Sequence, residues 1–287
     1  MSKTDAEISR TPFSPPWTAQ PPREPVFDDP AMIAALRAQH LQIVFQPQYT
    51  LSTMQLRGFE ALARLSVDEH HWVPPDRFLP LAQAAGLMGA LTLHMVEAAC
   101  QALRGWRDGG RSPVFIAVNI EPDDLADVLF APRVCRLLAE YRVAAGELEL
   151  ELVERRALGA DATTQTSIAV LRAAGIRFAM DDFGTGQSAL SQLGDLPFDI
   201  VKIDKTFLHR VPCDPAACTL LPHVIALCLA LHKEVVVEGV ESDEQLQWLV
   251  QQQQRGLRVQ GNALSFPLPE ALAAASISLL PGFSPKE

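Results

Sequence analysis

The chain has 287 residues, of which 48% are hydrophobic and 20% are charged, and its 24 Lys and Arg against 34 Asp and Glu give a net charge of −10. This composition excludes a collagen, a coiled coil and a wholly disordered chain. The acidic balance argues against binding to duplex nucleic acid, which requires a basic face, but it permits a small anionic ligand whose charge is met by a metal ion. The length fits one or two domains, and an α/β barrel of about 250 residues forms a single domain.

The N-terminal segment is rich in proline, with seven prolines between Thr11 and Pro30. Because proline lacks an amide donor and fixes φ, we expect residues 1–35 to form a flexible tail and residues 36–287 to form the domain. A polyproline segment that binds a partner is the alternative for this tail.

Several sequence features predict a cytoplasmic protein. No apolar segment follows a basic start at the N-terminus, so a secretory signal is not expected. The most apolar helical stretch, Val224–Leu231, is much shorter than the roughly 20 residues that span a bilayer. The five cysteines form no CxxC pair, which is typical of reduced thiols.

Beyond the tail, short apolar runs alternate with amphipathic stretches. The expected strands are Gln42–Pro47, Leu56–Leu65, Val114–Val118, Leu148–Leu152, Arg177–Met180, Ile200–Ile203, Val235–Val237 and Leu257–Val259. The expected helices are Asp76–Ala85, Leu91–Arg107, Pro132–Tyr141, Asp161–Ala174, Ala216–His232 and Asp243–Gln251. This alternation predicts a largely parallel sheet, and eight strands in roughly 240 residues fit a (β/α)8, or TIM, barrel. Only a few residues, around Leu51–Gln55, lie between the first two strands, which is too short for a helical crossover, so we expect that pair to be antiparallel.

Polar residues end five consecutive strands of this predicted barrel. They are Asn119, Glu151, the pair Asp181 and Asp182, Lys202, and Glu238, and Glu60 in the second strand can join them. Because the carboxyl ends of barrel strands converge on one face, these side chains are expected to meet at one mouth.

A single acidic residue at a strand end is usually an ordinary surface charge. A set of acids brought together by apolar strands repels itself unless something positive lies between them. Oxygen ligands of this kind suit Mg²⁺ or Mn²⁺ better than zinc. Lys202 is then expected to position water or phosphate, and adjacent Asp181 and Asp182 favour two metal ions. The pattern indicates phosphoryl transfer or metal-assisted hydrolysis.

The ordered motifs of the chain resemble those of the EAL domain family, cyclic di-GMP phosphodiesterases. They are Glu60-Ala61-Leu62-Ala63-Arg64, Val118-Asn119-Ile120, Glu151-Leu152-Val153-Glu154, Asp181-Asp182-Phe183-Gly184-Thr185-Gly186, Val201-Lys202-Ile203-Asp204, Glu238-Gly239-Val240-Glu241 and Gln260-Gly261. The resemblance covers residues 36–282, and an ordered set of this length is much more specific than a lone Glu-Ala-Leu. It implies a stand-alone EAL domain with a modified TIM (β/α)8 barrel and an antiparallel first strand.

The resemblance also implies roles for individual residues. The implied metal ligands are Glu60, Asn119, Glu151, Asp181, Asp182 and Glu238, and the implied catalytic residues are Glu238 as general base and Lys202 as a contact of the attacking water. The implied substrate contacts are Gln46, Leu62, Arg64 and Gln260, and supporting roles fall to Glu154, Gly184, Thr185, Gly186 and Glu241. The planar guanidinium of Arg64 matches a pair of phosphate oxygens.

The implied reaction is hydrolysis of cyclic di-GMP to linear 5′-pGpG, which lowers a bacterial second messenger linked to biofilm formation and motility. The implied cofactor is Mg²⁺ or Mn²⁺, one or two ions per site, with Ca²⁺ expected to inhibit. The resemblance further implies a homodimer formed through the loop after Asp182 and neighbouring helices.

A departure at Asn262–Phe266, where the family usually has a tyrosine after the Gln-Gly pair, leaves one alternative open. The protein can be a cyclic di-GMP receptor or protein-interaction module with weak or no catalysis. A metal-dependent barrel hydrolase acting on another phosphodiester is a more distant alternative. Because none of the implied metal ligands is missing, we prefer an active enzyme.

Overall fold

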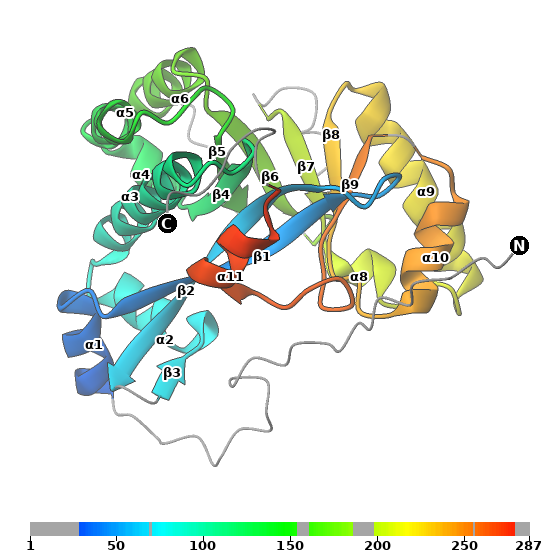
Figure 1. The fold of residues 1–287 in the computed structure, drawn as a ribbon, viewed down its shortest axis with the longest axis horizontal. Coiled ribbons are helices and arrows are strands. Elements are labelled where there is room, and N and C mark those ends of the chain that lie inside the picture. Colours follow the sequence, from blue (N-terminus) through cyan, green and yellow to red (C-terminus); the bar gives the residue numbers. More distant parts are fainter. Residues whose placement is uncertain (1–28, 69–70, 154–160, 186–197, 255, 279–287) are drawn as a thin grey trace, which may run out of the picture.

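In the computed structural model, which describes residues 29–68, 71–153, 161–185, 198–254 and 256–278, eight strands close into a barrel (Figure 1). In chain order they are β1 (Leu41–Thr50), β2 (Leu56–Asp68), β4 (Phe115–Ile120), β5 (Leu148–Val153), β6 (Arg177–Phe183), β7 (Ile200–Ile203), β8 (Glu234–Val237) and β9 (Leu257–Val259). Their order around the barrel is β1-β9-β8-β7-β6-β5-β4-β2, and β2 pairs back to β1. Two short strands extend the sheet, with β3 (His71–Val73) on β2 and β10 (Leu268–Pro269) on β1.

The first strand of the barrel is antiparallel to its neighbours. β1 runs antiparallel to both β2 and β9, while the remaining neighbours around the barrel are parallel. The link between β1 and β2 is the short turn that the sequence indicates, and a helical crossover needs a dozen or more residues. The predicted modified TIM barrel with an antiparallel first strand is therefore confirmed.

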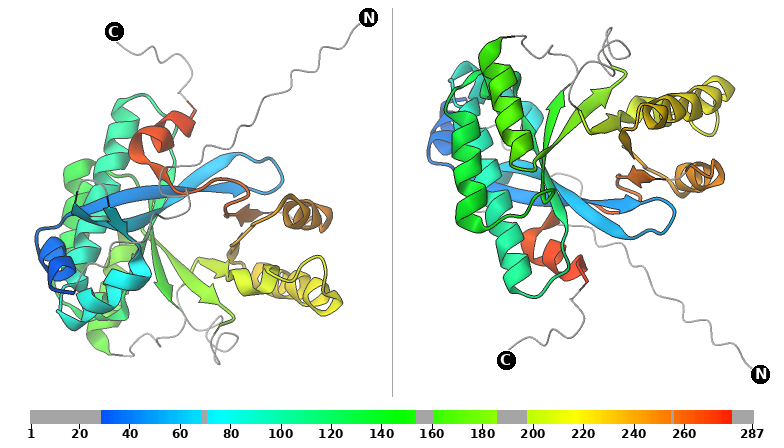
Figure 2. Two further views of the ribbon diagram at one scale, coloured as in Figure 1. Left: turned by 90° about the horizontal axis from the view of Figure 1, so that it is seen from below. Right: turned by 90° about the horizontal axis from the view of Figure 1, so that it is seen from above.

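Helices cover the outside of the barrel (Figure 2). They are α1 (Asp29–Arg37), α2 (Pro75–Ala84), α3 (Met88–Asp108), α4 (Pro122–Ala126), α5 (Phe130–Tyr141), α6 (Ala162–Ala173), α8 (Lys205–Leu208), α9 (Pro215–Ala230), α10 (Asp243–Gln251) and α11 (Glu270–Ser276). Figure 2 shows α3, α5 and α6 on one side of the barrel and α9 and α10 on the other. Side chains of Asp161, Asp214 and Ser242 accept backbone N–H groups at the starts of α6, α9 and α10, which fixes where these helices begin.

The boundary expected between residues 35 and 36 lies inside a helix. α1 begins at Asp29 and buries Met32 and Leu36 in a cluster with Leu65 and Phe78. Residues 29–35 are thus part of the packed structure rather than of a tail, because Pro30 lies in the first turn of the helix, where its missing N–H costs nothing. Residues 1–28 lie outside the described part of the chain.

Apolar side chains of the strands pack in two separate places, between the barrel and its helices and along the barrel axis. Ile116, Leu150 and many other strand residues face outward and pack against the helices in the main hydrophobic core. Because side chains alternate across a strand, their neighbours face the barrel axis. There Ala179, Ile200 and Val236 form a small apolar layer of their own.

The end of the barrel where the parallel strands begin is closed by a buried ion network. Arg258 Nη1 donates hydrogen bonds to Gln48 Oε1 and Glu149 Oε2, both at 3.0 Å. Arg177 Nη1 lies 3.2 Å from Glu149 Oε1, and Arg177 Nη2 lies 2.7 Å from Glu234 Oε1. Buried charges are tolerated only when they are paired in this way.

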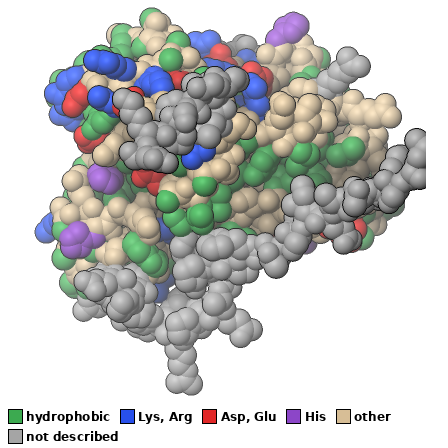
Figure 3. Space-filling view, viewed as in Figure 1, with side chains coloured by type: hydrophobic (Ala, Val, Ile, Leu, Met, Phe, Trp, Pro, Cys, Tyr) green, Lys and Arg blue, Asp and Glu red, His purple; other side chains and the backbone are tan. Residues whose placement is uncertain are grey.

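Charges on the visible outer surface are mixed. In Figure 3, basic and acidic side chains are interspersed over the region that α3, α5 and α6 cover. The surface seen in this view therefore does not concentrate the net negative charge in one place.

None of the helices in the described residues combines the length and apolar character that a membrane span requires.

Gly58 provides a test of the packing between β2 and β4. A Cβ at Gly58 would lie 2.5 Å from Phe115 O and 2.6 Å from Phe115 Cγ, so both strands would have to shift. We expect Gly58→Ala to lower the free energy of unfolding by about 1–3 kcal/mol in urea denaturation. The control is Gly105→Ala in α3, where a Cβ meets no other described atom within 4 Å, and we expect it to leave stability unchanged or raise it by up to ~1 kcal/mol. Equal denaturation midpoints for the two variants would contradict this packing.

Candidate metal centre at the barrel mouth

Lys202 lies among four carboxylates at the carboxyl ends of the parallel strands. Its side chain is 1% exposed, and Nζ lies 2.7 Å from Glu151 Oε2, 2.9 Å from Asp181 Oδ1, 2.9 Å from Glu238 Oε1 and 3.5 Å from Glu60 Oε2. Lys202 is on β7, and the four acids come from β5, from β6, from the residue after β8, and from β2. Five separate segments of the barrel thus bring their charges to one place, as the strand ends predicted.

Glu60 is also fixed by neutral side chains. Asn119 Nδ2 donates to Glu60 Oε1 at 2.9 Å, and Gln260 Nε2 donates to Glu60 Oε2 at 2.6 Å. Gln260 Nε2 also donates to Gln46 Oε1 at 2.9 Å. Three residues expected at the site, Asn119, Gln46 and Gln260, therefore lie around Glu60.

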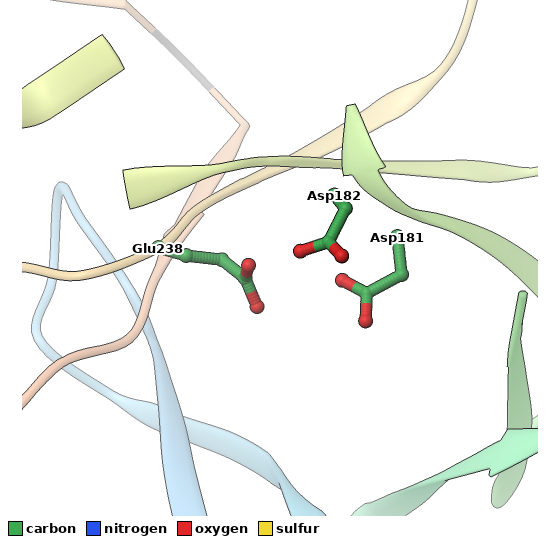
Figure 4. Close-up of side chains that lie close together, drawn as sticks. All are labelled: Asp181, Asp182 and Glu238. Carbon is green, nitrogen blue, oxygen red and sulfur yellow. The ribbon is translucent and has the colours of Figure 1, made fainter. Parts of the chain in front are cut away.

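Asp181, Asp182 and Glu238 form a compact group of acids. Each offers one carboxylate oxygen, and these oxygens lie within 4.8 Å of one another. Figure 4 shows the Asp181 and Asp182 carboxylates on one strand facing that of Glu238. Asp182 has a φ of 55°, in the left-handed region that few residues other than glycine adopt. Such strained backbone is often found where a functional group has to be presented in a particular direction.

Two of the acids around Lys202 have a raised pKa. Burial raises the pKa of Glu151 well above its usual range, against the opposing effect of Lys202. Burial, aided by the charges of Asp181 and Glu60, raises the pKa of Glu238 from 4.5 to about 8, although Lys202 lowers it. Burial by itself would lower the pKa of Lys202, but the surrounding carboxylates outweigh it and raise this pKa well above its ordinary value. One ammonium group is thus insufficient for all of these acids.

The donor atoms at the mouth fit a hard divalent cation. They are carboxylate oxygens together with the carboxamide of Asn119, and described histidines and cysteines do not join the acidic group. Mg²⁺ and Mn²⁺ prefer such oxygen ligands. A cation here would oppose the effect of burial on the pKa of Glu151 and of Glu238, because metal ligands must be deprotonated.

The remaining predicted substrate contacts lie on β2, a few residues beyond Glu60. Leu62 and Arg64 are both half-buried. Arg64 Nη1 donates to the carbonyl oxygen of Ala63 at 2.8 Å. Burial lowers the pKa of Arg64, and the nearby charge of Glu60 opposes this effect. The Arg64 guanidinium therefore supplies positive charge near Glu60.

The residues expected to support the site are only partly visible. Gly184 has a φ of +97°, and a Cβ there would collide with the ring of Phe207. Thr185 Oγ1 donates to the carbonyl oxygen of Asp182 at 3.0 Å, which closes the turn after β6. Glu241 is exposed on the loop after β8. Two predicted residues, Glu154 and Gly186, lie outside the described residues.

Two groups of buried polar residues were missed in the sequence. One is the ion network around Arg258 and Glu149. The alternation Leu148-Glu149-Leu150-Glu151-Leu152 indicates it in the sequence. When the leucines face the helices, both glutamates must face the barrel axis. The other is Gln245, in a Ser242-x-x-Gln245 capping box that the sequence also displays.

An α/β barrel with an antiparallel first strand and an acidic mouth defines the class of this protein. The EAL domain model matches residues 31–267. The chain therefore belongs to the EAL domain family.

Relatives with a described activity support this assignment. The chain is 33% identical over 237 residues to the cyclic di-GMP phosphodiesterase NbdA of Pseudomonas aeruginosa. This match covers 83% of this chain and 30% of NbdA. It is 31% identical over 240 residues to the cyclic di-GMP phosphodiesterase RocR of the same organism, covering 83% of this chain and 60% of that protein. The chain thus spans only part of the length of these relatives.

Solved structures show the same fold. A PaMucR phosphodiesterase in complex with c-di-GMP aligns with a TM-score of 0.76 at 30% identity, covering 84% of this chain and 97% of that one. An EAL domain protein from Listeria monocytogenes EGD-e aligns with a TM-score of 0.73 at 27% identity, covering 88% of this chain and 98% of that one.

The raised pKa of Glu238 predicts how stability depends on pH. Between its ordinary value of 4.5 and about 8, the folded protein keeps a proton that the unfolded chain has lost, so the stability of the metal-free protein should fall as pH rises through this window. In thermal unfolding with EDTA, we expect Tm to decrease from about pH 6 to about pH 8.5. Mg²⁺ or Mn²⁺ should raise Tm more at the higher pH, because cation binding then displaces fewer protons.

The Glu238→Gln variant is the matched control for this measurement, because it removes the titrating group while preserving its shape. We expect its metal-free Tm to depend less on pH than that of the wild type. A wild-type Tm that rises across the same window, or an identical pH dependence in the variant, would contradict the assignment of the proton to Glu238.

Proposed function

We propose that this protein hydrolyses cyclic di-GMP to linear 5′-pGpG in a reaction that depends on a divalent cation. The observation that supports it is the gathering of Glu60, Asn119, Glu151, Asp181, Asp182 and Glu238 around Lys202 at one end of the barrel. Membership of the EAL family supplies the substrate, since the relatives NbdA and RocR are named as cyclic di-GMP phosphodiesterases.

The same six residues are the proposed ligands of one or two Mg²⁺ or Mn²⁺ ions. When bound, such ions supply charge that polarises a phosphate group and makes a water molecule more acidic. Ca²⁺ has the same charge but looser geometry, so we propose that it supports binding and inhibits turnover.

The side chains of the chain itself have distinct proposed roles. Glu238 is the proposed general base, as membership of the EAL family implies, and its carboxylate lies at the mouth with Oε1 2.9 Å from Lys202 Nζ. The Lys202 ammonium group orients the attacking water. Gln46, Leu62, Arg64 and Gln260 hold the dinucleotide, with the planar fork of Arg64 on a phosphate group.

A catalytically weak receptor is the second candidate function. Gln46 Nε2 lies 3.4 Å from both Asn262 Oδ1 and the carbonyl oxygen of Ser265, so the altered segment after Gly261 touches a proposed substrate contact. A change at this place can alter the affinity for the dinucleotide without altering the acids around Lys202.

We also propose a homodimer formed through the loop after Asp182 and the neighbouring helix α9. No Lys, Arg, Asp or Glu occurs in α9, and Leu220 and Leu227 on its outer side are 53% and 41% exposed. A surface helix normally carries charge on its outer face, and an exposed apolar face indicates a partner.

The five free cysteines agree with the proposed cytoplasmic location.

The hydrolysis assay tests the leading function. Purified protein with cyclic di-GMP and Mg²⁺ or Mn²⁺ should form pGpG, followed by chromatography. Glu60→Gln removes one charge at the mouth and should reduce kcat/KM at least ~100-fold, which corresponds to about 2.7 kcal/mol of activation free energy. Glu140→Gln on the exposed side of α5 is the control, and it should behave as wild type.

Two results would count against the phosphodiesterase. One is intact substrate with either cation at neutral to alkaline pH, and the other is equal activity of Glu60→Gln and wild type. Calorimetric titration of cyclic di-GMP in the presence of Ca²⁺ then separates the two candidates, because tight binding without hydrolysis in Mg²⁺ identifies a receptor.

The dimer is tested by light scattering after size-exclusion chromatography. The double variant Leu220→Glu with Leu227→Glu should shift the protein from a dimeric to a monomeric mass, because two charges cannot be buried unpaired in an interface. Val170→Glu on α6, which is 41% exposed, is the control and should leave the mass unchanged. A wild-type protein that is monomeric at all concentrations would rule out this interface.

A further inference from the structure

Glu238 is presented by a short loop, Gly239–Glu241, that is packed on both sides. Glu238 N donates to Ile203 O at 3.1 Å, which continues the ladder between β8 and β7. Val240 N donates to Gln260 O at 3.1 Å. Gly239 has a φ of +66°, and a Cβ there would collide with Lys205 in the first turn of α8. The position of Glu238 therefore depends on how this loop is held against α8 and the end of β9.

Gln245 holds this loop from the first turn of α10. Its side chain is buried, with 6% exposed. Oε1 accepts hydrogen bonds from Glu241 N at 2.8 Å and from Ser242 N at 3.2 Å, while Nε2 donates to the carbonyl oxygen of Leu208 at 3.1 Å. Of these three side-chain bonds, the capping box accounts only for the one from Ser242 N, which is paired with the bond from Gln245 N to Ser242 Oγ. The other two bonds fix the loop and connect it to a different element.

The third bond connects the segments that follow two neighbouring strands. Leu208 is the last residue of α8, which begins three residues after Lys202. Gln245 thus ties the loop after β8 to the helix after β7, and these strands carry the two charges whose atoms Lys202 Nζ and Glu238 Oε1 lie 2.9 Å apart. The hydrogen bonds that Gln245 makes here are with backbone groups, so any effect on the site is exerted through position.

We propose that Gln245 is a positioning residue that fixes the Glu238 carboxylate relative to Lys202 and Asp181, and thereby sets the affinity of the mouth for a divalent cation. This inference rests on the proposed function for its catalytic consequence. Its consequence for cation binding and for the loop itself can be measured without turnover.

Three variants test this inference. Gln245→Met keeps the size of the side chain and removes all three hydrogen bonds, whereas Gln245→Glu keeps the two acceptor bonds and loses the donor to Leu208. Gln247→Met changes an exposed residue of the same helix and is the control. Each variant is studied well below its own Tm, so that global unfolding does not contribute.

The first measurement is hydrogen exchange of the backbone amides in residues 238–245, and the second is Mn²⁺ binding by calorimetry. In Gln245→Met we expect faster exchange at Glu241 and Ser242 and a Mn²⁺ affinity weaker by about 10-fold or more. In the hydrolysis assay, kcat should fall more than KM rises, because the substrate contacts lie on other strands. Gln245→Glu should lie between Gln245→Met and wild type, and Gln247→Met should match wild type.

An unchanged Mn²⁺ affinity in folded Gln245→Met would overturn the inference, even if amide exchange were faster. Gln245 would then anchor the loop without setting the position of the Glu238 carboxylate. If Gln245→Met does not fold, the same comparison is made with Gln245→Glu. A wild type that binds Mn²⁺ without hydrolysing cyclic di-GMP would refute the proposed enzyme, while a loss of affinity in the variants would still support Gln245. A wild type that binds no Mn²⁺ would overturn both.

Discussion

Carboxylates can lie close together at the mouth of this barrel only because a positive charge lies among them. In the described structure that charge is the buried ammonium group of Lys202, which contacts Glu60, Glu151, Asp181 and Glu238. One positive charge does not balance four negative ones, and burial raises the pKa of Glu151 and of Glu238 despite the nearby ammonium group. The proposed divalent cation would remove this imbalance, and the strands, loops and amides around the mouth hold the acids close enough together to bind one.

The rest of the barrel interior permits such a concentration of charge. A thin apolar layer of Ala179, Ile200 and Val236 separates the acidic mouth from a second ion network around Arg258 at the opposite end, in which Glu149 is paired. Placing ionic groups at the two ends and apolar side chains between them keeps each charge close to a partner. The net charge of −10 therefore overstates the repulsion that the proposed anionic substrate would meet, because part of it lies in the proposed cation site.

Much of the site was predictable because a single local pattern determines it. An apolar strand that ends in a polar residue places that residue at the mouth, which is how Asn119, Glu151 and Lys202 were found without any knowledge of their partners. The antiparallel first strand followed from one short turn. Predictions failed or were missing where the determinant is not local. Arg258 and Glu149 are 109 residues apart and meet only after the barrel closes, and the left-handed backbone of Asp182 depends on its tertiary surroundings. At α1, the proline-rich composition does not show where the packed structure begins, because Pro30 lies in the first turn of a helix, where proline is accepted.

The central claim is that the acids around Lys202 form a divalent-cation site, and diffraction at the manganese absorption edge from crystals grown with Mn²⁺ tests it most directly. We expect an anomalous peak among the carboxylates of Asp181, Asp182 and Glu238, with Lys202 Nζ withdrawn from at least one of the four acids that it contacts at the barrel mouth. A mouth without an anomalous peak, in which Lys202 keeps all four contacts, would contradict it.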